Sequence, residues 1–253
     1  RPPWALAGVL LTAAAALLVA SARHLLRVPA PLVNLRVLQI PTLGNTIAAQ
    51  VLFLLTVGSI PFLLVLLFQD VFGWSPVKAG ALVIGVFVGN IAIKPATTPL
   101  LNRFGFRNVL LVATTTLAAT SVLCGLLTAA TPLVVIVALA IVSGAARSTG
   151  MTAYSTMAFS GVPPDRMRDA NTLSATVLML GNGLGIAAAS VALRGGGPLG
   201  ELLPGDQGPG TAYAVAFAVM ALGALGATAL AVRLHPTAGD ALRKKRREVE
   251  AAA

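Results

Sequence analysis

The sequence predicts an all-α membrane protein with about seven transmembrane helices. Of the 253 residues, 57% are hydrophobic and only 10% are charged, whereas about 25% of the residues in a soluble domain are charged. The mean hydropathy is +0.87. Apolar runs long enough to cross a bilayer recur along the chain, and nearly all basic residues fall between them. These observations exclude an ordinary soluble domain.

Seven apolar runs reach the roughly 20 residues that a helix needs to cross a bilayer. They cover residues 4–22, 43–68, 79–101, 109–129, 133–159, 171–193 and 212–232. The second run contains Gly58 and Pro61, which predict a bend or a tilt. Residues 195–210 are rich in glycine and proline, so we expect an irregular loop there.

The distribution of Lys and Arg predicts the orientation in the membrane. Thirteen of the 18 basic residues fall in one set of loops and in the C-terminal tail, and only Arg1, Lys78 and Arg194 fall in the other set. Because cytoplasmic loops are enriched in Lys and Arg, we expect a multi-pass protein of the cell membrane with a cytoplasmic C-terminus. The net charge of +10 therefore reflects topology in a lipid bilayer, and we expect no binding to nucleic acid.

Two segments outside the runs have their own character. The segment LVNLRVLQI is too short to cross a bilayer and mixes Leu and Val with Arg36 and Gln39. We expect residues 23–42 to form an amphipathic connector along the cytoplasmic interface, and residues 233–253 to form a basic cytoplasmic tail near the headgroups.

The first run allows two interpretations. The chain begins with Arg1 rather than Met, so we expect it to be part of a longer protein whose first run is a full span. The alternative is a signal peptide with small residues at a cleavage site near residues 20–22.

Arg147 lies near the middle of the fifth run, with mostly apolar or small residues on either side. An unpartnered guanidinium is costly at that depth, so Arg147 is expected to face a wet cavity or, alternatively, to bind helix-end carbonyls. Ser143 lies one turn before it and Tyr154 two turns after it, on the same side of the helix. We predict that these three side chains line a substrate cavity.

Other polar residues in the runs are candidates for the same cavity. Asn90 and Lys94 share a face of the third run; Lys94 is either a cavity or gate cation or a side chain that snorkels to the headgroups. Gln50 and Asn45 on the second run, and Asn182 on the sixth, either line the cavity or form interhelical hydrogen bonds.

Small residues recur every four positions in several runs, and such rows let neighbouring helix backbones approach closely. The glycines predicted to pack helices in this way are Gly85, Gly89, Gly144, Gly181 and Gly185.

Several kinds of site are not expected. All eight acidic residues lie at span ends, in loops or in the tail, so proton coupling through a buried acid is not expected within this chain. The two histidines lie far apart outside the runs, and Cys124 is the single cysteine, in an apolar run, so we expect no metal site and no disulfide. The sequence GNGLG lies within an apolar run rather than after a strand, which argues against nucleotide binding. We expect no enzymatic activity and no cofactor.

Three longer segments carry a family resemblance: PLVNLRVL before the second run, RFGFRNVLLV after the third, and VPPDRMRDANTLSATVLMLGNGLGIA between the fifth and the sixth. With these segments the chain resembles the C-terminal half of a major facilitator superfamily transporter, in the drug:proton antiporter family with fourteen spans. The resemblance implies that residues 1–22 are a linker helix and that residues 43–232 are the six-helix half. RFGFRN resembles the second-half copy of a cytoplasmic loop motif, matched at Arg103, Gly105 and Arg107.

The resemblance also implies a function. Such a transporter exports small hydrophobic compounds in exchange for protons by alternating access, with the substrate between the N-terminal and C-terminal halves. The chain holds one of the two halves, so we do not expect it to transport alone. The alternative is a non-transporting half or scaffold that pairs with another chain. A seven-span retinal protein is disfavoured because residues 212–232 hold neither a lysine nor a carboxylate counter-ion nearby.

Overall fold

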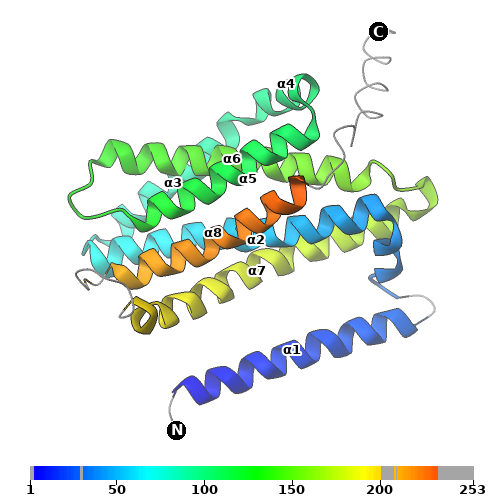
Figure 1. Ribbon diagram of the computed structural model, residues 1–253, viewed down its shortest axis with the longest axis horizontal. Coiled ribbons are helices and arrows are strands. Elements are labelled where there is room, and N and C mark those ends of the chain that lie inside the picture. The colour runs from blue at the N-terminus through cyan, green and yellow to red at the C-terminus, as the bar shows by residue number, and fades with distance from the viewer. Residues whose placement is uncertain (1–2, 29–30, 201–207, 209, 233–253) are drawn as a thin grey trace.

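The computed structural model describes residues 3–28, 31–200, 208 and 210–232 of the chain. The helices are α1 (Pro3–Arg27), η1 (Leu35–Gln39), α2 (Pro41–Leu66), η2 (Leu67–Val71), α3 (Pro76–Ala92), α4 (Lys94–Phe104), α5 (Phe106–Gly125), α6 (Leu133–Phe159), η3 (Pro164–Arg166), α7 (Met167–Gly200) and α8 (Thr211–Val232). No strand occurs among these residues. The predicted all-α architecture is confirmed (Figure 1).

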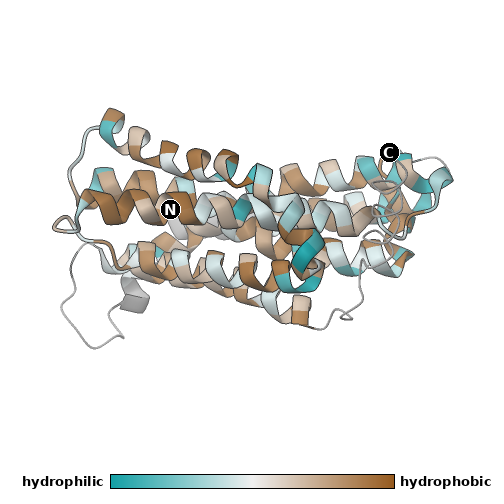
Figure 2. Ribbon diagram, turned by 90° about the horizontal axis from the view of Figure 1, so that it is seen from above, coloured by the Kyte–Doolittle hydropathy of each residue, from teal (hydrophilic) through white to brown (hydrophobic). Residues whose placement is uncertain are grey.

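Five elements are long and apolar enough to cross a bilayer, and α3 with α4, bent by 50°, is a sixth if the pair forms one span. Hydrophobic residues predominate along these helices (Figure 2). The first expected span falls in α1, several of whose side chains lie outside the described part of the chain. In such helices the backbone N–H and C=O groups are hydrogen-bonded within each helix, as the apolar interior of a bilayer requires.

The helix α2 forms the centre of the bundle. It packs against α6, α7 and α8, and about half of the residues in its most apolar stretch are buried inside the bundle. A helix that is apolar on every side is typical of a buried core helix or a membrane span. Pro41 starts this helix at a position where proline is well tolerated. The helix continues through Pro61 and ends in the π-helical turn η2.

The predicted third span is broken rather than continuous. The chain bends at Ile93, between α3 and α4, because Pro95 lacks the amide hydrogen that a continuing helix needs and its ring crowds the preceding turn. Lys94 therefore begins a new helix, and the axis of α4 differs in direction from that of α3.

One predicted boundary is wrong. Residues 195–200, predicted as part of an irregular loop, continue the helix α7. The helix continues because unpaired backbone N–H and C=O groups are costly near lipid. A Cβ at Gly196 would lie 2.5 Å from the carbonyl oxygen of Ala212, so α7 and α8 are in close contact here. Gly196 lets the end of α7 approach the start of α8.

The helices α1 and α2 extend into the two ends of the segment predicted as the connector, residues 23–42. Residues 23–27 belong to α1, residues 41–42 belong to α2, and only η1 and its flanks lie between them. Val37 of η1 is fully buried with Ala158, Ala170 and other residues at the ends of α6 and α7. The side chain amide of Asn34 donates a hydrogen bond to Asp169 at 2.7 Å. The connector is thus attached to the corner between α6 and α7. The predicted basic tail, residues 233–253, lies outside the described residues.

Candidate functional site

Arg147 lies in the middle of α6, on the side that faces the gap between α2 and α3. One turn before it, Gly144 lies directly against the backbone of Val86 in α3, and one turn after it, a Cβ at Gly150 would lie 2.6 Å from the ring of Phe53 in α2. Because residues one turn apart share a helix face, Arg147 points between these two neighbours. It is half-buried, and no described residue forms a hydrogen bond or an ion pair with it.

Ser143 and Tyr154 share this side of α6 but lie deeper than predicted. Ser143 is 1% exposed, and Tyr154 is fully buried. The Tyr154 ring packs against Phe53, with 5.3 Å between the ring centroids. Its hydroxyl has no hydrogen-bond partner among the described residues. Tyr154 therefore joins α6 to α2 through its ring, and its phenol adds no open polar surface in this conformation.

Asn90 and Lys94 lie on either side of the break in the third span. Asn90 is half-buried. A Cβ at Gly144 would lie 3.0 Å from the backbone nitrogen of Asn90, so this part of α3 lies beside the turn that precedes Arg147. Lys94 is exposed at the start of α4. Asn90 and Arg147 therefore come from neighbouring turns of two packed helices, whereas Lys94 lies where the chain changes direction.

Gln50 and Asn182 have different environments. Gln50 is 4% exposed in α2, one turn before Phe53, so it lies close to the contact between α2 and α6. The side-chain amide of Asn182 donates to the carbonyl of Leu178, one turn earlier in its own helix, at 2.8 Å. The interhelical hydrogen bond considered for Asn182 does not form; its backbone packs against Gly58 of α2 instead.

Five glycines lie at two helix contacts. Gly85, Gly89 and Gly144 lie between α3 and α6: a Cβ at Gly85 would lie 3.2 Å from that of Ala140, and one at Gly89 or Gly144 would overlap the facing backbone. Gly181 and Gly185 lie between α7 and α2, where a Cβ would come within 2.8 Å of the Leu54 side chain and 2.5 Å of the Leu55 carbonyl oxygen, respectively. The absence of side chains at these positions sets how closely the helices approach.

The turn between α4 and α5 holds the three residues of the loop motif. Gly105 has φ 81° and ψ 160°, a conformation that is essentially restricted to glycine. Arg107 donates a hydrogen bond from Nη2 to the carbonyl oxygen of Val232, the last residue of α8, at 2.9 Å. Arg103 is exposed, and its guanidinium carbon lies 5.4 Å from the ring centroid of Phe104. Gly105 thus forms the turn, and Arg107 joins α5 to the end of α8.

The sequence of this bundle matches the profile of a known protein family. The profile of the Major Facilitator Superfamily matches residues 46–252, which is most of the chain. The chain belongs to the Major Facilitator Superfamily. The matched part includes α2 from residue 46 onward and all of α3 through α8, and with them the neighbourhood of Arg147.

Curated relatives in this superfamily have names that refer to drug resistance. The chain is 26% identical over 191 residues to "Putative multidrug resistance protein MdtD" of Salmonella heidelberg (strain SL476), covering 76% of this chain and 40% of that protein. It is 28% identical over 160 residues to the protein of the same name from Serratia proteamaculans (strain 568), covering 63% and 34%. The matched part of the chain thus covers less than half the length of these relatives.

Two polar contacts of this superfamily member were not predicted from the sequence. Tyr213 at the start of α8 donates a hydrogen bond to Asp70 at the end of η2, at 2.5 Å, and Asn34 bonds Asp169 in the corner. Each pair joins segments more than a hundred residues apart, so no local pattern reveals it. The sequence indicates only that each acidic residue lies at the end of a span. Polar residues that can donate a hydrogen bond to it lie at the ends of other spans.

Proposed function

We propose that this chain supplies the C-terminal half of a secondary active transporter that exports hydrophobic, drug-like compounds in exchange for protons by alternating access. Family membership supports the class of protein, and the names of the MdtD relatives support the class of substrate. The observation that carries the proposal is the position of Arg147: a guanidinium at mid-helix, half-buried, without an ionic partner in the described chain.

A guanidinium at this depth needs water, an acidic partner or a ligand, because lipid cannot solvate it. Arg147 points between α2 and α3, and apolar side chains are exposed elsewhere on the bundle, such as Ile91 of α3 at 68% and Met179 of α7 at 78%. An N-terminal half packed against this side would enclose a water-filled cavity with Arg147 in its wall. Substrate binding at the interface of two repeats is how such transporters achieve alternating access.

The acid that binds the coupled proton would lie in the other half. In the described spans, Asp70 and Asp169 occupy helix ends, and no acidic residue lies at mid-helix. Arg147 would then interact with substrate, or with that acid when substrate leaves. A charge pair of this kind can link deprotonation to the change between outward and inward states.

The orientation in the cell membrane is part of the proposal. The connector, the turn after α4 and the corner between α6 and α7 lie at one end of the bundle (Figure 1), and Arg36, Arg103, Arg166 and Arg168 belong to these segments. The positive-inside rule assigns that end to the cytoplasm. The C-terminal tail would then be cytoplasmic too.

Export by the full-length transporter tests the proposal. Ethidium and Nile red efflux would be followed in inverted vesicles that carry a pH gradient. We expect Arg147→Ala to abolish efflux at normal protein abundance, and Arg147→Lys to retain part of it, because Lys keeps the charge but loses the planar five-donor group. If Arg147→Ala exports at the wild-type rate, or fails only because it does not reach the membrane, Arg147 has a structural role and the proposal is wrong.

A further inference from the structure

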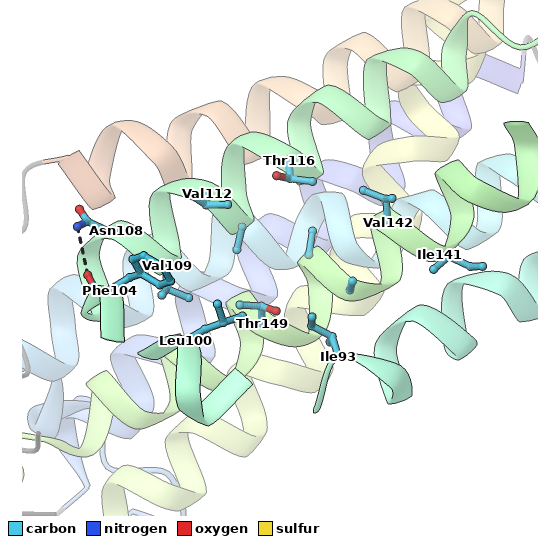
Figure 3. Close-up of a pocket in the computed structure, with 13 residues that line it drawn as sticks. Ile93, Leu100, Phe104, Asn108, Val109, Val112, Thr116, Ile141, Val142 and Thr149 are labelled. Atoms are coloured by element: carbon cyan, nitrogen blue, oxygen red, sulfur yellow. Dashed lines mark hydrogen bonds between the residues drawn. The ribbon is translucent and has the colours of Figure 1, made fainter. Parts of the chain in front are cut away.

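A cavity lies on the outer side of the bundle, between α4, α5 and α6 (Figure 3). Its volume is about 440 Å³, within the roughly 300–1,000 Å³ of small-molecule sites. Aliphatic side chains such as Leu100, Val112 and Ile141 form most of the wall. Asn108 is one of few polar residues there, and its amide already donates to the Phe104 carbonyl at 3.1 Å. An occupant of this cavity must therefore be apolar.

This cavity is separate from the side on which Arg147 lies. Ala145, two residues before Arg147, belongs to the wall, and residues two apart point to nearly opposite sides of a helix. Val112 and Phe104 are 66% and 52% exposed at the rim, so the cavity opens to the surroundings of the bundle. For a helix bundle in a membrane, these surroundings are lipid.

The break between α3 and α4 accounts for the cavity. Ile93, at which the chain bends by 50°, is part of its wall. The bend turns α4 out of the direction in which α3 packs along α6, and the cavity lies where α4, α5 and α6 meet. Apolar cavities that stay empty destabilise a protein, since their walls lose contacts. An acyl chain is the apolar material available at that position.

The rim of the cavity carries a cation. The Arg103 guanidinium lies beside the ring of Phe104, whose side chain is part of the wall. Arg103 is exposed and forms no ion pair with the described residues. By contrast, Arg107 is engaged with the Val232 carbonyl. Arg103 is thus free to bind the anionic group of a molecule whose apolar part lies in the cavity. A guanidinium matches the geometry of a phosphate well.

We propose that this cavity binds one anionic phospholipid, with an acyl chain between α4, α5 and α6 and the headgroup phosphate at Arg103. The inference requires that the bundle spans a bilayer; it does not require the proposed transport function. The bound lipid fills the space that the broken span leaves and holds α4 against α5 and α6.

Native mass spectrometry of the full-length transporter tests this proposal. The purified protein would be equilibrated with phosphatidylglycerol or phosphatidylcholine of identical chains, and retained lipids counted. We expect one tightly retained phosphatidylglycerol. Ala145→Phe and Val112→Trp, which fill the cavity, should remove it. Leu123→Trp is the matched control, because Leu123 is also exposed on α5 but lies outside the cavity.

The charge is tested separately. We expect Arg103→Gln to reduce the preference for phosphatidylglycerol over phosphatidylcholine about fivefold, the effect of one basic residue on an anionic headgroup. We expect Arg166→Gln, in η3 and outside the cavity wall, to leave this preference unchanged. The proposal fails if the cavity-filling variants retain as much lipid as Leu123→Trp, or if Arg103→Gln keeps the wild-type preference. Should both filling variants misfold, the Arg103→Gln result alone decides.

Discussion

Gly185→Ala is expected to weaken the contact between α7 and α2. A Cβ at this position would lie 2.5 Å from the carbonyl oxygen of Leu55, whereas non-bonded heavy atoms prefer about 3.5 Å, so the two helices must separate by about 1 Å. The obstacle is backbone, which cannot rotate away as a side chain does. Overpacking of this kind costs about 1–3 kcal/mol, which lowers the melting temperature of a domain of this size by roughly 2–4 °C per kcal/mol.

Two neighbouring glycines supply the controls for this substitution. Gly183 lies in the same helix with nothing within 4 Å of its would-be Cβ, and Gly181 faces the flexible side chain of Leu54 at 2.8 Å. Gly183→Ala should be neutral or stabilising by up to about 1 kcal/mol, because alanine favours the helix. Gly181→Ala should fall between the two. Melting curves of the detergent-solubilised protein measure all three, and equal effects of Gly183→Ala and Gly185→Ala would refute the packing argument.

Three further substitutions test other contacts. Gly105→Ala should cost about 1–3 kcal/mol, because its φ of 81° is strained for any other residue; a melting temperature equal to wild type would show that the turn relaxes. Arg107→Gln should lose about 1 kcal/mol with the hydrogen bond to Val232, and faster hydrogen exchange at the end of α8 is the expected signature. Tyr213→Phe removes the hydrogen bond to Asp70 and should cost about 1 kcal/mol, whereas an unchanged melting curve would mean that water replaces the phenol.

The general architecture was predictable because it depends on local composition. Apolar runs of bilayer length identify spanning helices without knowledge of their neighbours. The end of the fifth run at residue 159 was equally visible, since α6 ends at Phe159. The small-residue rows marked positions such as Gly89 and Gly144, which the structure places at the contact between α3 and α6.

What could not be predicted depends on contacts between distant segments. The sequence placed Tyr154 on the side of Arg147 but could not show that Phe53 covers its ring. Nor could helix periodicity show whether Asn182 would bond within its own helix or to another, because both satisfy the amide. Residues 195–200 looked like a loop because glycine disfavours helices in water; beside α8 and lipid, unpaired backbone would cost more.

The central claim is that Arg147 faces a water-filled cavity between two transporter halves while the opposite side of α6 faces lipid. Arg147→Cys and Ala145→Cys, each in full-length protein without other accessible cysteines, place a thiol on either side of one helix. We expect a charged, membrane-impermeant thiol reagent to modify position 147 in open vesicles, substrate to slow that reaction, and position 145 to stay unmodified. If position 145 reacts as fast as position 147, or if position 147 does not react, Arg147 does not line an aqueous cavity and the account is wrong.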